Sequence, residues 1–168
     1  MEREHKLKQL LRIARAFEAA KIDWAAGGSL MLWFRGVCAD FHDLDLTVSD
    51  ADGPRAADIL ARMGAALPLP PAGKFRTKLF RRYEIEGVEV DLMAGLAVED
   101  ECGLRAFPLS ADPGVERAGF RGARIPLQGL AYWAEIYRAM GRSARAAEIE
   151  RWLAAKDRAA SAEPPRSD

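Results

Sequence analysis

The chain has 168 residues, of which 49% are hydrophobic and 30% are charged. This length and composition predict one globular domain with a sizeable core and exclude a disordered or fibrous chain. The 25 Lys and Arg residues balance the 25 Asp and Glu residues, so the chain lacks the cationic excess of a uniformly basic nucleic-acid-binding protein. No apolar run approaches the roughly 20 residues of a membrane helix, and the charged N-terminus lacks the apolar core of a signal peptide. We therefore expect a cytoplasmic protein with no membrane partner, in which the two widely spaced cysteines, Cys38 and Cys102, are buried thiols.

Helix and strand patterns alternate from the N-terminus onward. Apolar residues recur at steps of three and four over residues 7–17, which predicts an amphipathic helix. Residues 22–25 indicate a short strand that ends at the turn Gly27-Gly28-Ser29. The short apolar run at residues 30–34 then predicts a buried helix.

The middle of the chain has clearer strand periodicity. Apolar and polar residues alternate over residues 43–48, which predicts a strand with one acidic face. A helix with a proline at its start is predicted for residues 52–63, and a proline-rich loop for residues 67–73. Residues 78–85 and 88–93 flank a turn and predict a β-hairpin.

The remainder is less regular until its helical end. Residues 94–112 show no clean period, whereas residues 115–125 indicate a second, smaller hairpin. Helical patterns follow at residues 127–140 and 142–153. The order of elements predicts an α/β (α+β) fold with a mixed sheet.

Charge is balanced overall but segregated locally. Five aspartates and no cation lie between residues 36 and 54, and five cations and no acid lie in residues 74–82. A carboxylate cluster that faces a cationic strip would suit a phosphate substrate with its bound metal ion. Two unrelated surface loops would give the same charge pattern.

The sharpest motif is the glycine turn followed by two strand aspartates. Asp43 and Asp45 stand two positions apart on a predicted strand, so both project from one face. Two carboxylates held this close repel each other unless a cation lies between them, and such oxygen ligands suit Mg²⁺ together with substrate phosphates. Gly28 lets the backbone approach a ligand closely, and Ser29 offers a hydroxyl and amides to phosphate.

A third carboxylate occurs on a later strand. Asp91 alternates with apolar residues over residues 88–93 and faces the same way as Glu89. If this strand lies beside the strand of Asp43 and Asp45, the three carboxylates could hold two metals, or one metal and a general base. Ordinary solvated strand residues are the alternative for each of them.

This combination resembles the nucleotidyltransferase superfamily with the DNA polymerase beta-type palm. The similar features are Gly-Gly-Ser, the Asp-x-Asp strand and the distal strand aspartate, and the likeness covers residues 22–93 well and residues 125–153 more loosely. The narrower likeness is to small bacterial members: lincosamide- and aminoglycoside-type antibiotic nucleotidyltransferases, associated with antibiotic resistance, and the nucleotidyltransferase-type toxins of toxin–antitoxin systems.

The resemblance implies a nucleotidyltransferase palm over residues 1–126, C-terminal helices over residues 127–155 packed on the same domain, and a disordered tail over residues 156–168. It makes Asp43, Asp45 and Asp91 the catalytic metal ligands for Mg²⁺ or Mn²⁺, with Asp91 alternatively the base. It makes Gly28 and Ser29 the turn that holds the triphosphate.

Further nucleotide contacts are expected from the cationic strip, namely Lys74, Arg76 and Lys78. Arg81 and Arg82 are as consistent with a solvated strand edge. Relatives often carry a lysine on the first C-terminal helix, and Arg138 stands in the corresponding stretch here. Arg and Lys are not equivalent phosphate ligands.

The implied activity is the transfer of a nucleoside monophosphate from an NTP, with ATP preferred, to an acceptor hydroxyl, with release of pyrophosphate. The acceptor could be a small molecule, an RNA end or a protein, and an RNA or antitoxin partner is possible. The alternative is a non-catalytic module of the same fold that binds a nucleotide or a partner.

Overall fold

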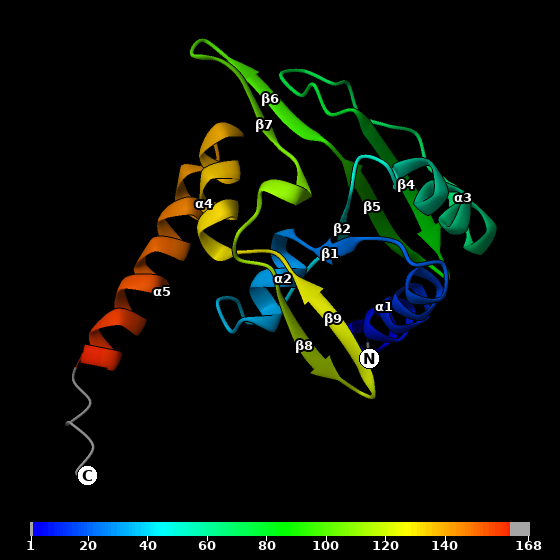
Figure 1. The fold of residues 1–168 in the computed structure, drawn as a ribbon, viewed down its shortest axis with the longest axis horizontal. Coiled ribbons are helices and arrows are strands. Elements are labelled where there is room, and N and C mark those ends of the chain that lie inside the picture. The colour runs from blue at the N-terminus through cyan, green and yellow to red at the C-terminus, as the bar shows by residue number, and fades with distance from the viewer. Residues whose placement is uncertain (1, 162–168) are drawn as a thin grey trace.

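The computed structural model describes residues 2–161, which form a seven-stranded mixed sheet, a separate two-stranded hairpin and flanking helices (Figure 1). The helices are α1 (Glu2–Ala19), α2 (Gly28–Phe34), α3 (Gly53–Met63), α4 (Leu130–Ala139) and α5 (Ser143–Ser161), with a 3₁₀ turn at Leu109–Ala111. The strands are β1 (Trp24–Ala26), β2 (Leu44–Val48), β3 (Ala65–Ala66), β4 (Leu79–Ile85), β5 (Val88–Ala94), β6 (Leu96–Asp100), β7 (Gly103–Phe107), β8 (Glu116–Phe120) and β9 (Ala123–Leu127).

The sheet has the strand order β3-β4-β5-β2-β1-β9-β8. Its centre is the parallel pair β2 and β5, which antiparallel strands β1 and β4 flank on either side. The chain between β2 and β5 contains α3 and the β3–β4 segment, and this crossover makes the parallel pairing possible. The α/β fold with a mixed sheet that the sequence predicts is confirmed.

The two faces of the sheet differ in chemistry. One face is apolar and is covered by α1 and α3; its buried central residues are Leu44, Leu46, Val48, Val90 and Leu92. At its edge, the Tyr83 hydroxyl donates to the carbonyl of Ala57 in α3. Since strand residues alternate between faces, Asp45 and Asp91 necessarily lie on the opposite face, toward α4.

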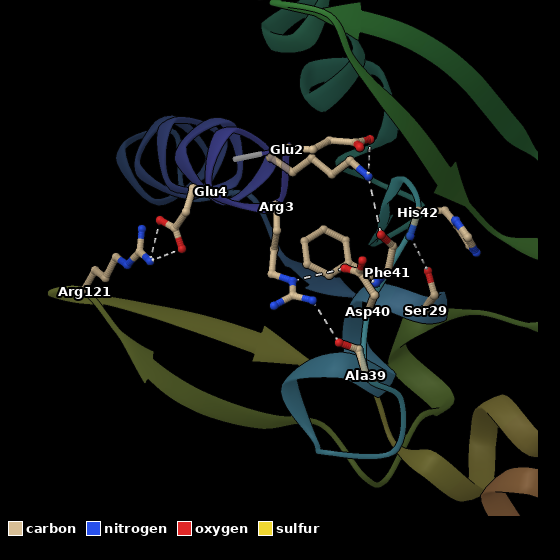
Figure 2. A network of polar contacts seen from close by, with 10 residues as sticks. Glu2, Arg3, Glu4, Ser29, Ala39, Asp40, Phe41, His42 and Arg121 are labelled. Carbon is tan, nitrogen blue, oxygen red and sulfur yellow. Dashed lines mark hydrogen bonds and ion pairs between the residues drawn. The ribbon is translucent and has the colours of Figure 1, made fainter.

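The segment that enters β2 is fixed by contacts from outside it (Figure 2). Arg3 of α1 pairs with Asp40 at 3.1 Å, and the buried Phe41 ring anchors the segment in the core. The backbone N–H of His42 donates to the Ser29 hydroxyl oxygen at 3.3 Å. Together these contacts hold the chain immediately before Asp43, so the acidic strand begins at a defined position.

Three details differ from the sequence-based expectations. Residues 94–112 form the hairpin β6–β7 and the 3₁₀ turn, and Cys102 is exposed in the hairpin turn while Cys38 is half-buried, so the prediction of two buried thiols is wrong. Helix α5 continues to Ser161, so residues 156–161 are helical rather than part of a tail (Figure 1). The rest of the predicted tail lies outside the described residues.

Within residues 2–161, none of the helices has the length and apolar character needed to cross a bilayer.

Candidate functional site

The predicted carboxylates come together across the central parallel pair. Asp45 of β2 is directly in register with Asp91 of β5. Asp43 lies immediately before β2, outside the strand, and is not among the residues that line the cavity described below. Glu89 of β5 is next to Asp43, and burial, followed by contact with Asp43, raises the pKa of Glu89. The face therefore carries four acidic side chains, of which the sequence analysis assigned three to the site.

Asp45 has the most strongly perturbed environment of the four. Burial raises the pKa of Asp45 well above its ordinary value, and the charges of Asp91 and Asp43 raise it further. The positive charges of Arg142 and Arg82 offset part of this effect. A bound cation would stabilise the ionised form of this carboxylate.

The glycine turn after β1 packs directly on Asp45. Gly28 has φ +55°, and a Cβ built there would lie 2.1 Å from Asp45 Oδ2. Glycine is therefore required both by the backbone conformation and by the close approach of the carboxylate. Ser29, the other predicted residue of the turn, is buried and directed to the backbone of His42, and it is not part of the cavity wall described below.

Arg82 is the cation at the centre of the site. Its Nε donates to Asp91 Oδ1 at 2.8 Å and its Nη2 to Asp91 Oδ2 at 3.1 Å, while Glu89 lies 3.2 Å away. The hydrogen bonds to Asp91 raise the pKa of Arg82. From the sequence, Arg82 is as consistent with a solvated strand edge, yet the hairpin turn at Glu86 and Gly87 already implies that it lies opposite Asp91.

A cavity of about 730 Å³ opens over these residues. Gly28, Asp45 and Asp91 lie at its base, and Trp133 and Tyr137 of α4 form one side. The opposite side comes from the loop before β4 and from β4 itself, and it is mainly apolar. The residues of that side are Leu69, Pro70, Pro71, Ala72, Phe75, Thr77, Lys78, Phe80, Arg81 and Arg82.

The structure separates the three predicted nucleotide-binding cations. Lys78 is part of the cavity wall, but its ammonium pairs with Asp50 at 2.7 Å. Arg76 bonds the carbonyl of Gly73 and lies 3.5 Å from Glu99, outside the wall. Lys74 is also outside it and reaches the turn between α4 and α5, where its Nζ would lie 3.1 Å from a Cβ on Gly141.

The turn between α4 and α5 carries a cation that was not assigned to the site from the sequence. Arg138 pairs with Glu150 of α5 and takes no part in the cavity wall. Arg142 instead lines the cavity, with its guanidinium 5.0 Å from the centre of the Tyr137 ring. Burial, and then the charge of Asp45, raises the pKa of Tyr137 to about 12, so its hydroxyl remains protonated at neutral pH.

A buried polar network supports the glycine turn from below. Gln128 Oε1 accepts hydrogen bonds from Thr47 Oγ1 and Trp133 Nε1, both at 2.8 Å. A Cβ on Gly27 would lie 2.6 Å from the same oxygen, so this network is in contact with the turn. The network connects β2, the end of β9 and α4 at the base of the cavity.

The three residues predicted to hold a metal share one type of donor atom. Asp43, Asp45 and Asp91 supply only carboxylate oxygens, which suit Mg²⁺. Burial, followed by the charges of Asp91 and Asp43, raises the pKa of Asp45. Within the described residues 2–161, however, no three acidic, histidine or cysteine side chains lie close enough together to hold a metal ion. Asp91 instead accepts hydrogen bonds from Nε and Nη2 of Arg82.

No family model and no curated protein sequence matches the chain. Solved structures do: a candidate nucleotidyltransferase from Thermotoga maritima matches 90% of this chain and 94% of its own, with a TM-score of 0.70 and 22% identity. The antibiotic-resistance factor ANT(2'')-Ia matches 95% of each chain, with a TM-score of 0.56 and 14% identity. Lincomycin-bound lincosamide antibiotic adenylyltransferase LnuA matches 84% of this chain and 96% of its own, with a TM-score of 0.53 and 14% identity. The chain therefore has the fold of the nucleotidyltransferases.

Proposed function

We propose that the protein is a metal-dependent nucleotidyltransferase that moves a nucleoside monophosphate from an NTP to an acceptor hydroxyl and releases pyrophosphate. The observation that carries this proposal is the in-register pair Asp45 and Asp91 beneath Gly28, at the base of a cavity of about 730 Å³. The proposal is also supported by the fold that the chain shares with nucleotidyltransferases.

Asp43, Asp45 and Asp91 would hold Mg²⁺ or Mn²⁺ in this proposal. When bound, the metal neutralises negative charge on the phosphates and orients them for in-line displacement. Asp91 accepts one hydrogen bond from Arg82 at each carboxylate oxygen, and each oxygen keeps a further lone pair that could coordinate the metal.

The chain's own groups bind the nucleotide and handle the proton. Gly28 lets the backbone come close to the triphosphate, and Arg142 and Arg82 place positive charge at the cavity wall. The acceptor oxygen attacks the α-phosphorus, and its proton passes to a carboxylate of the site. The bond from the α-phosphorus to the bridging oxygen breaks, and pyrophosphate leaves.

The nucleotide in the proposal is ATP and the acceptor is a small molecule. Two of the structural neighbours support this choice: LnuA is an adenylyltransferase of a lincosamide antibiotic, and ANT(2'')-Ia has been solved with adenylyl-2''-tobramycin. The experiment below also tests an RNA end and a protein side chain as acceptors.

The experiment incubates the protein with each α-labelled NTP and Mg²⁺, together with small-molecule, RNA and protein acceptors in turn. The proposal expects Mg²⁺-dependent pyrophosphate release with ATP and label on one acceptor class, both lost in Asp45→Asn. Asp58 of α3 provides the matched control: it is exposed, and Asp58→Asn removes a carboxylate outside the cavity, on the other side of the sheet. Release that is unchanged in Asp45→Asn would contradict the proposal.

A nucleotide-binding module without turnover is the second candidate. Two observations favour it: Arg82 binds Asp91 through two hydrogen bonds, and the described residues contain no three-ligand cluster. This candidate predicts that Mg²⁺-ATP binds and that pyrophosphate release stays at background with every acceptor class.

A further inference from the structure

The apolar residues on the side of the cavity formed by the proline-rich loop and β4 have no role in the activity proposed above. Leu69, Pro70 and Pro71 lie on the loop, and Phe75 and Phe80 continue the same wall. Leu69 is 45% exposed, so its side chain is accessible to a ligand in the cavity. We refer to these five residues as the apolar wall.

Strand order separates the apolar wall from the glycine turn. Gly28 follows β1, Asp45 is on β2, Asp91 is on β5 and Phe80 is on β4, and these strands are consecutive neighbours in the order β4-β5-β2-β1. The carboxylates consequently lie between the turn on one side and the wall on the other. When the triphosphate binds at Gly28, the apolar wall remains accessible to the acceptor, which approaches the carboxylates from the side opposite the glycine turn.

The charges around the cavity restrict what that molecule can be. Among the described residues that line the cavity, the carboxylates are Asp45 and Asp91, and both belong to the metal and phosphate chemistry. The other charged residues of the lining are cations: Lys78, Arg81, Arg82 and Arg142. A ligand with several ammonium groups would find no further carboxylate in the lining to pair with, and it would face like charge.

We propose that the apolar wall is the acceptor subsite and that the acceptor is a hydroxyl-bearing small molecule with an uncharged, apolar body, not a polycationic sugar. This inference rests on the proposed nucleotidyl transfer and names its acceptor class. Apolar contacts with the wall supply affinity, and the hydroxyl is directed toward Asp45 and Asp91.

The test uses N-phenyl-1-naphthylamine, a neutral apolar fluorescent probe, in titrations of the full chain with and without Mg²⁺ and the α,β-methylene analogue of ATP. The variant Leu69→Ser changes an exposed wall residue, and Leu104→Ser is the matched control, since Leu104 is 61% exposed on β7 and outside the cavity. Phe80→Ser is a second wall variant, and thermal unfolding checks that every variant is folded.

The proposal expects that Leu69→Ser weakens probe binding at least about fivefold, whereas Leu104→Ser changes it less than about twofold. Tobramycin is expected not to displace the probe, and the ATP analogue to leave the probe affinity within about twofold. Displacement by tobramycin would overturn the inference, as would equal affinities in Leu69→Ser and Leu104→Ser. Competition between the probe and the ATP analogue would make the wall a nucleobase pocket and would also overturn it.

The two proposals fail separately. Binding of the ATP analogue is measured by calorimetry without the probe, and a lack of binding there would contradict the nucleotidyltransferase proposal. The response of the probe to Leu69→Ser and to tobramycin still decides whether the wall takes an apolar or a polycationic ligand.

Discussion

Gly28 is the position at which one added carbon atom is expected to separate stability from nucleotide binding. An alanine there would have to adopt φ +55°, and its Cβ would lie 2.1 Å from Asp45 Oδ2 and 2.9 Å from Asp45 Cγ. The left-handed conformation costs a non-glycine residue about 1–2 kcal/mol. The overlap is relieved when the Asp45 carboxylate moves away from its position beside Asp91.

Gly73 provides the matched control because it has the same φ of +55° and a Cβ there would meet nothing within 4 Å. We expect both Gly28→Ala and Gly73→Ala to lower the free energy of unfolding in urea by about 1–2 kcal/mol. Displacing one charged ligand costs about 1.5–3 kcal/mol, so Gly28→Ala should weaken Mg²⁺-ATP-analogue binding about 10- to 150-fold in calorimetry. Gly73→Ala should bind as the parent does. Equal nucleotide affinity in the two variants would refute the reasoning.

Three further predictions concern the carboxylates and their support. The folded state raises the pKa of Asp45 above its unfolded value of about 3.9, so the folded chain keeps the proton to a higher pH than the unfolded chain does. The free energy of unfolding therefore falls as the pH rises from the unfolded pKa to the folded pKa. In EDTA, the stability advantage of Asp45→Asn over the parent should therefore grow from acid to neutral pH, measured by urea unfolding; a constant difference would contradict this. Asp91→Asn leaves Arg82 with one acceptor fewer and should lower the free energy of unfolding by about 1–3 kcal/mol; turnover lost with nucleotide binding retained would indicate a base, and loss of both would indicate a metal ligand. Gln128→Leu leaves Thr47 and Trp133 without their acceptor and should lower the free energy of unfolding by about 1–3 kcal/mol for each buried donor, measured by thermal and urea unfolding. An unchanged free energy of unfolding would contradict this and would indicate that water replaces the amide.

Periodicity predicted most of the fold because the sheet has one apolar and one polar face. The alternation of Leu44, Leu46 and Val48 with polar residues predicted β2, and the turn at Glu86 and Gly87 predicted the β4–β5 hairpin. The hairpin β6–β7 lacked such a signal, since four of the five residues of β7 are exposed and neither of its faces is consistently apolar. The end of α5 was missed because its last residues are exposed and carry no apolar stripe.

The site was predictable where spacing alone determines geometry. Two residues two positions apart on a strand share a face, so Asp43 and Asp45 were expected together. The register of Asp45 with Asp91 was not predictable, because a parallel pairing depends on a crossover of about forty residues rather than on a turn. The position of Arg142 in the cavity wall depends in the same way on how α4 docks over the sheet.

The central claim is that the α-phosphorus, and not the γ-phosphorus, is transferred. The most direct measurement supplies the protein with Mg²⁺ and an apolar hydroxylated acceptor, together with ATP labelled in parallel reactions at the α- or the γ-phosphate, and follows where each label goes. The account predicts the α-label on the acceptor and the γ-label in pyrophosphate, in equal amounts, with both products absent in Asp45→Asn. A γ-label on the acceptor or in inorganic phosphate would show phosphoryl transfer or hydrolysis instead, and would contradict it.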